Sequence, residues 1–215
     1  RVTGERDTAN KVNEQLTEVK EQLTERVAQL QLNAPLCEAA GLNDIDSVQR
    51  LLQSGRNANE ADVQGFTPLI HAARRGNSIY VIEQLVDHKA DVNLAAGTEK
   101  RTPLIHAAER GHEGMIKLLV ARKADVNMAA GTTGSEMTPL HLAVHHLRVG
   151  AVRTLLQLGA ERSHRGGTYF TPYRMLESCQ IQRATGYGKS LSEDQIAREN
   201  AIERLLMPDM PPRTS

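Results

Sequence analysis

Three histidines near the middle of the chain are the first candidates for chemistry. His141 and His145 are four residues apart on one predicted helix, which places two imidazoles on the same face, and His146 follows directly. Two imidazoles at this spacing can bind zinc, but a zinc site needs further nitrogen, sulfur or oxygen ligands. No Glu or Cys stands at a spacing that completes such a set. We therefore expect no metal site.

Two other features contain residue types that occur in catalytic sites. The segment 186–190 ends like a phosphate-binding loop, but that motif needs a further glycine where Arg183 stands and a buried strand before it. Cys37 and Cys179 have no histidine close in the sequence that could activate a thiol, so a small, buried, apolar role fits them better. We expect no catalysis and no cofactor. The two distant cysteines indicate an intracellular reducing compartment, cytoplasmic or nuclear.

The elements that carry these residues are organised by one recurring phrase. Its copies begin at positions 34, 67, 102, 138 and 171, with offsets of 33, 35, 36 and 33 residues. The clearest copies read TPLIHAA, from Thr67 and again from Thr102, whereas the copies that begin at Ala34 and Thr171 have diverged. A nearly fixed period in this range predicts a repeat architecture.

Each phrase predicts the start of a helix that ends about ten residues later. The threonine supplies an N-cap hydroxyl, and the proline that follows already has a helical φ and lacks an amide that would need a partner. Gly76 and Gly111 are typical of the left-handed residue that ends a helix. A second apolar run follows each glycine, as in Val81, Ile82 and Leu85. Each unit is therefore predicted to be helix, turn, helix.

The sequence resembles the ankyrin repeat family in these residues. The opening phrase, the glycine between the helices and the ADVN ending stand in register over roughly residues 34–165, and a degenerate copy extends the resemblance to about residue 206. The resemblance implies an all-α solenoid of helix-turn-helix units with short β-hairpin-type loops. It also implies that His141, which occupies the family's histidine position, has a hydrogen-bonding role. The loops over residues 94–101 and 128–137 are longer than the family pattern.

Composition limits the partners that such an array would bind. The chain has 215 residues, 40% of them hydrophobic but only 3% aromatic, which suits stacked helices better than a large globular core. Lys plus Arg and Asp plus Glu are both 26, so net charge gives no reason to expect nucleic-acid binding. No apolar run reaches the length of a membrane span. We expect neither nucleic-acid binding nor direct membrane insertion.

The N-terminal residues 1–32 differ from the repeats and are expected to form one long amphipathic, coiled-coil-like helix. Apolar residues occupy most heptad a and d positions of residues 9–30, and Arg26 interrupts them. Packing against the first repeat as a cap, self-association as a homodimer through residues 9–30, and partial disorder all remain open. The predicted repeat domain covers residues 34–207, with a degenerate capping unit at 171–207. Residues 208–215 are expected to be a disordered tail.

The resemblance also indicates which residues contact a partner: those in the turn before each phrase and the two after each Ala-Ala pair. These positions line the concave side of such an array. They include a row of basic side chains, which Lys100 and Arg101 extend, and a set of expected exposed apolar anchors, Phe66, Met137, Tyr169 and Phe170. The predicted partner-binding residues are Val63, Gln64, Phe66, Arg74, Arg75, Arg101, Glu109, Arg110, Met137, His145, His146, Tyr169 and Phe170.

Basic and apolar residues in this arrangement predict a non-catalytic protein interaction module. Its expected partner is another protein, through an acidic or phosphorylated segment. The competing interpretation treats the arginines as solvated helix ends. Two alternatives for the whole chain remain. Because the chain opens on Arg1, it is compatible with a regulatory or targeting fragment of a larger enzyme or channel. It is also compatible with a scaffold that self-associates through the N-terminal helix.

Overall fold

The computed structural model divides the chain into two compact units, residues 1–35 and 36–215. It describes residues 16–22, 36–76, 79–133, 136–164, 171–184 and 192–208. In the first unit, residues 16–22 are helical, and Leu16 and Val19 are 53% and 50% exposed. The remainder of the predicted N-terminal helix, the loop at 186–190 and the tail beyond residue 208 lie outside the described residues.

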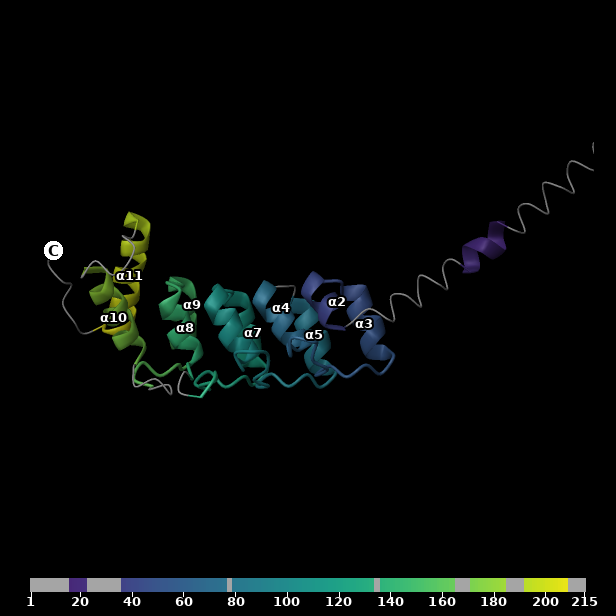
Figure 1. Cartoon of the computed structure of the whole chain (residues 1–215), viewed down its shortest axis with the longest axis horizontal. Helices are drawn as coiled ribbons and strands as arrows, with labels where there is room; N and C mark the ends of the chain where they lie inside the picture. Colours follow the sequence, from purple (N-terminus) through teal and green to yellow (C-terminus); the bar gives the residue numbers. More distant parts are fainter. Residues whose placement is uncertain are drawn as a thin grey trace, which may run out of the picture. The chain divides into compact units, whose positions relative to one another are not determined.

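The second unit is a row of helix pairs that follow one another along the chain (Figure 1). First helices pack on first helices and second helices pack on second helices, so the pairs form two layers. This arrangement confirms the predicted all-α repeat solenoid. None of the described helices is long and apolar enough to cross a membrane. The pairs are α2 (Leu36–Leu42) with α3 (Ile45–Gln53), α4 (Pro68–Arg75) with α5 (Ile79–Asp87), α6 (Pro103–Arg110) with α7 (Glu113–Ala121), α8 (Pro139–His145) with α9 (Val149–Gln157), and α10 (Pro172–Ala184) with α11 (Glu193–Leu206).

The recurring phrase starts the first helices as predicted. The hydroxyl oxygens of Thr67 and Thr102 accept hydrogen bonds from amides in the first turn, at 3.3 Å and 3.2 Å, and a proline follows each threonine. Gly76 and Gly111 end α4 and α6 with φ of +69° and +81°, the left-handed region that costs a glycine little. The final helix α11 opens with a capping box, which Ser192 forms with Gln195.

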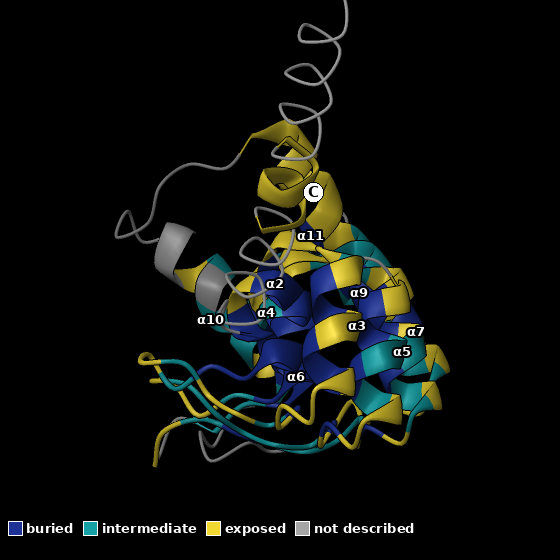
Figure 2. Ribbon diagram, turned by 90° about the vertical axis from the view of Figure 1, so that its right-hand side faces the viewer, coloured by how far each residue is buried: buried dark blue, intermediate teal, exposed yellow. Residues whose placement is uncertain are grey.

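The core lies between the two layers and runs through all the units (Figure 2). The leucine of each phrase, as in Leu69, Leu104 and Leu140, is almost completely buried. The small alanine pairs after them are also fully buried in α4 and α6. Because alanine has a short side chain, neighbouring first helices can approach closely at these positions.

Asparagines at the end of three units join each unit to the next. The Asn93 side-chain oxygen accepts a hydrogen bond from the Asp125 amide at 2.9 Å, and its side-chain nitrogen donates to the Lys123 carbonyl at 3.2 Å. Asn59 and Asn127 make the same pair of bonds to the following unit. The ADVN ending therefore fixes the register between units, a role that the repeat pattern alone did not reveal.

A second link between units forms where the first helices end. The His112 ring lies against Gly76, and its Nε2 atom is 3.4 Å from the Arg74 carbonyl oxygen. Arg148 repeats this contact one unit later, because its Nε atom donates to the Glu109 carbonyl at 3.0 Å. Polar hydrogens from the next unit therefore satisfy carbonyl groups that a helix end leaves without a partner.

We predict that Leu104→Ala lowers the free energy of unfolding by about 2–5 kcal/mol, because it leaves a cavity between α6 and its neighbours. The measurement is urea denaturation followed by circular dichroism. Leu42→Ala is the matched control, since Leu42 is largely exposed and its truncation should change stability by less than about 0.5 kcal/mol. Equal losses in the two variants would contradict the assignment of Leu104 to the core.

Candidate functional site

Phe66 corrects one expectation about the partner-binding surface. The sequence indicated an exposed apolar anchor, but the side chain is buried and Phe66 is only 8% exposed. Its ring meets the edges of the His71 and His106 rings, with centroid distances of 5.7 Å and 6.1 Å, and the Arg74 guanidinium lies 4.5 Å from the ring centroid. Gly97, in the next loop, lies against the same ring. Phe66 therefore packs two units together and is not available as an exposed anchor.

Asp62 holds the turn that precedes Phe66. One carboxylate oxygen accepts hydrogen bonds from the Gln64 and Phe66 amides, both at 2.9 Å, and the other lies 2.7 Å from Nε2 of His71. Burial alone would raise the pKa of Asp62, but the hydrogen bonds from His71 and from the two amides outweigh it and lower the pKa. His71 therefore has a structural role that fixes the loop on α4.

Glu109 is an acidic residue among the basic residues of the predicted partner-binding set. Its carboxylate lies 3.4 Å from Nη1 of Arg101 and 3.6 Å from Nε2 of His146. Arg101 also pairs with Glu99 at 2.9 Å. The structure thus brings these predicted residues together, but as an internal charge cluster in which the carboxylates offset much of the positive charge.

Two of the phrase histidines are buried and have different surroundings. His141 accepts at Nδ1 from the Thr138 amide at 3.3 Å and lies 2.7 Å from the Thr138 hydroxyl, which confirms its hydrogen-bonding role. His106 is 3% exposed, and its Nε2 atom has no hydrogen-bond partner among the described residues. Burial lowers the pKa of His106 to about 4, although the Glu109 carboxylate opposes the shift. His106 is therefore neutral at pH 7.

The candidate metal residues and Cys37 are also placed, whereas the side chain of Cys179 lies outside what the structure describes. His145 and His146 are exposed and stack edge to face at 4.9 Å, whereas His141 is buried in the core. In the part of the chain that the structure describes, no three His, Cys, Asp or Glu side chains gather in a way that could hold a metal ion. Cys37 is buried with its sulfur 3.3 Å from the Glu60 and Phe66 carbonyl oxygens, and burial raises its pKa to about 11. A thiol with this pKa is a poor nucleophile.

Arg75 and Arg110 differ from the other predicted cations. Both are exposed, each is the last residue of a first helix, and neither forms an ion pair with any residue that the structure describes. Val63 and Gln64 are exposed in the loop before α4. Met137 is partly buried, packed against Ile105 and Leu142. The remaining predicted anchors, Tyr169 and Phe170, lie outside the described residues.

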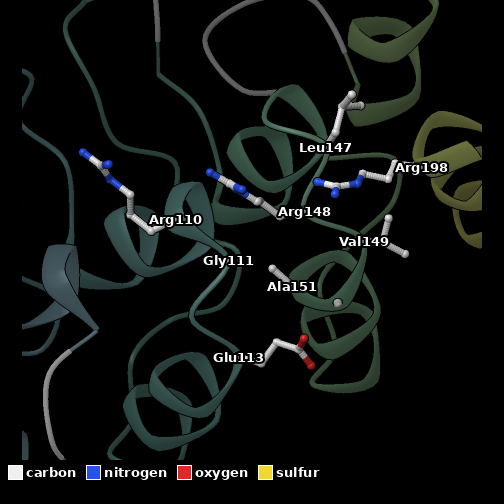
Figure 3. A pocket seen from close by; sticks show the side chains of 9 residues that line it. Arg110, Gly111, Glu113, Leu147, Arg148, Val149, Ala151 and Arg198 are labelled. Carbon is white, nitrogen blue, oxygen red and sulfur yellow. The ribbon is translucent and has the colours of Figure 1, made fainter. Parts of the chain in front are cut away.

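The structure adds a cavity that the sequence did not predict. It has a volume of about 280 Å³ and lies where the end of α6, the turn between α8 and α9, and α11 meet (Figure 3). Arg110, Arg148 and Arg198 line it together with Glu113. Of these, only Arg110 belonged to the predicted surface. Arg198 is 88 positions further along the chain, in a helix outside the clear repeats, so no sequence spacing relates the two.

The buried His106 predicts a pH-dependent stability. Its pKa is about 4 in the folded chain and close to 6.5 when unfolded, so the unfolded state takes up a proton first as the pH falls. The stabilisation is complete above pH 6.5 and is lost between pH 6.5 and 4. We expect a total loss of roughly 3 kcal/mol, measured by urea denaturation at several pH values. His106→Leu should flatten this slope.

His88→Gln serves as the control, because His88 is an exposed histidine at the end of a second helix. It should keep the parent chain's pH dependence. Carboxylate groups that titrate in the same range contribute to all three proteins and cancel in the comparison. An unchanged slope in His106→Leu would contradict the prediction.

The comparison with known families agrees with the geometry. A family model described as "Ankyrin repeats (3 copies)" matches residues 9–96, 36–130 and 81–165. No curated protein matches the chain. Ankyrin repeats generally mediate protein–protein interaction, and domains of this kind are typically non-catalytic. The Thr-Pro helix starts, the layered helix pairs and the family match over most of its length show that this chain belongs to the ankyrin repeat family.

Proposed function

We propose that the chain is a non-catalytic interaction module that binds an acidic or phosphorylated segment of a partner protein. The binding surface is formed by the ends of the first helices and the loops before them. The observation that carries the proposal is the exposure of Arg75 and Arg110, two cations without ion-pair partners in the described structure at equivalent positions of consecutive units.

The neighbouring cations differ from Arg75 and Arg110, because they are engaged in contacts within the fold. Arg74 covers the Phe66 ring, and Arg101 pairs with Glu99 and Glu109, so both have internal contacts. Arg75 and Arg110 have none of these contacts with described residues, although both gain some stabilisation from the negative end of a helix dipole. A solvated helix end explains one such arginine. Two of them in register also form a surface that an extended anionic segment can follow.

The spacing between these arginines limits the partner's conformation. α4 packs directly on α6, and packed helices lie about 8–10 Å apart. A polyproline II segment rises about 3.1 Å per residue with three residues per turn, so residues i and i+3 are about 9 Å apart on one side. An acidic or phosphorylated residue at every third position would therefore meet Arg75 and Arg110 in turn.

The proposal includes a cytoplasmic or nuclear location. It is supported by Cys37, which packs in the core as a thiol between two carbonyl groups, as expected in a reducing compartment.

We predict that Arg75→Glu with Arg110→Glu weakens partner binding at least about tenfold, because two attractive charges become repulsive. The measurement is affinity capture with quantification of each captured protein, followed by the binding affinity of its acidic segment. The melting temperature should change little, since both side chains are exposed.

Lys117→Glu with Arg153→Glu is the matched control, with the same change in net charge on exposed residues of the second helices. It should retain the partners that the parent chain captures. If the arginine variant captures the same partners with the same affinity, the proposed surface is wrong.

Self-association through residues 9–30 is a second proposal that one observation favours. Leu16 and Val19, at heptad positions of the described helical segment, are each about half exposed. A parallel partner helix would cover these side chains.

We predict that the full chain is a dimer and that Leu16→Glu with Val19→Glu makes it a monomer, because charge at these positions opposes helix pairing. Light scattering measures the mass. Thr17→Glu with Lys20→Glu, which places acids on the neighbouring positions, should leave more of the dimer intact. An unchanged mass for the Leu16 and Val19 variant would rule out this interface.

A further inference from the structure

We infer that the cavity between α6, the α8–α9 turn and α11 binds the phosphate group of a phosphorylated side chain on a partner protein. The inference rests on the proposed function and specifies one contact within it. The cavity of about 280 Å³ is lined by three arginines that come from three different elements of the fold (Figure 3). Arg110 ends α6, Arg148 precedes α9, and Arg198 lies in the second turn of α11.

The three guanidinium groups are held to different degrees. Arg148 is fixed, because its Nε atom donates to the Glu109 carbonyl oxygen at 3.0 Å and its methylene groups pack against Gly111. Arg198 pairs with Asp194 at 2.7 Å, one turn earlier on α11, and both side chains are exposed. Arg110 has no ion-pair partner among the described residues. In the view of Figure 3 the three groups lie in a row above the Glu113 carboxylate, with the Arg198 side chain directed toward Arg148 and the Arg110 side chain extending away from the other two.

Glu113 offsets one of the three positive charges in the lining, and its carboxylate also has a structural role. One oxygen accepts a hydrogen bond from the Thr154 hydroxyl at 3.4 Å. The carboxylate also lies against Gly150 in the first turn of α9, where a side chain at position 150 would have to displace it. A carboxylate at a helix N-terminus is stabilised by the positive end of the helix dipole. Glu113 therefore completes α9 and forms one wall of the cavity.

A phosphate monoester fits this arrangement better than a single carboxylate. It carries close to two negative charges at pH 7 and three terminal oxygens, so it can accept hydrogen bonds from more than one guanidinium. Guanidinium groups bind phosphate through paired, charge-assisted hydrogen bonds. Arg110 and Arg198 on the rim are exposed, which leaves room for the polypeptide that bears the phosphate. The Asp194 carboxylate competes only weakly with a phosphate for Arg198, because an exposed ion pair on one helix contributes little free energy.

The positive charge is local, which argues for a single phosphorylated residue and against a nucleic acid. Lys plus Arg and Asp plus Glu are equal at 26, so the chain offers no broad positive field to follow a phosphate backbone. The residues that line the cavity include three arginines and only one carboxylate, that of Glu113.

The test follows the arginine Nε–H signals of the full-length chain by nuclear magnetic resonance at pH 7 and constant ionic strength. The probe is acetyl-Ala-Gly-phosphoserine-Gly-Ala-amide, with the unphosphorylated peptide and inorganic phosphate as separate titrations. We expect saturable shifts for Arg110, Arg148 and Arg198 with the phosphopeptide, and none with the unphosphorylated peptide. Arg56, exposed after α3 and outside the cavity lining, should not follow the same saturation curve.

Substitutions then test the cavity itself. Arg110→Gln and Arg198→Gln should each weaken phosphopeptide binding about fivefold, a modest effect that reflects their exposure. The double variant should show no saturable binding. Arg56→Gln, at an exposed position after α3 that belongs neither to the cavity lining nor to the proposed binding surface, is the control and should bind like the parent chain. Equal weakening by Arg56→Gln, equal binding of the unphosphorylated peptide, or binding of inorganic phosphate without the phosphopeptide would each overturn the inference.

Failure of this inference can be told apart from failure of the proposed function. Arg75→Glu and Arg198→Gln, used singly, separate the surface of the first helices from the cavity. Loss of partner capture in Arg75→Glu without any saturable phosphopeptide binding would support the surface and overturn the cavity. Saturable phosphopeptide binding that Arg198→Gln weakens, with partner capture unchanged in Arg75→Glu, would support the cavity and contradict the surface.

Discussion

The rest of the structure depends on one constraint: a pair of short helices cannot bury its own apolar side. Each pair has helices of only seven to nine residues in the first four units, too short to be stable alone. The leucine and alanines of the phrase are buried because the next pair covers them. Stability in such an array comes from the contacts between neighbouring units, so sequence similarity between units is a requirement for packing.

The same constraint explains why many residues at predicted partner positions are occupied internally. A residue that faces the next unit can either bind that unit or remain available to a partner. Arg74, Arg101 and Glu109 make contacts across or within units, whereas Arg75 and Arg110 next to them form no ion pair with any residue that the structure describes. One position along a helix turns a side chain by about 100°, which is enough to separate these roles. Surface charge alone therefore overestimates the free positive charge of the array.

Sequence reasoning recovered the helix starts and ends because their causes are local. A Thr-Pro pair or a left-handed glycine acts on the adjacent turn, whatever the rest of the chain does. Contacts between units were predicted less well. The exposure of Phe66 depends on Gly97, which comes 31 positions later, and the pairing of Arg101 depends on the conformation of Glu109. The cavity was missed because Arg198 reaches it from α11, a helix whose position follows from packing on α9 and not from the repeat period.

The asparagine links have a consequence for how the chain can change over evolutionary time. Asn59, Asn93 and Asn127 are spaced by 34 residues, although the phrases that begin the units are spaced by 35 and 36. Each asparagine binds only backbone groups of the following unit, so the link is indifferent to the side chains there. A gene duplication or deletion of one whole block would recreate the same junction. The loops between these asparagine links can then lengthen independently of one another. Each loop can therefore change its sequence and the partner that it contacts.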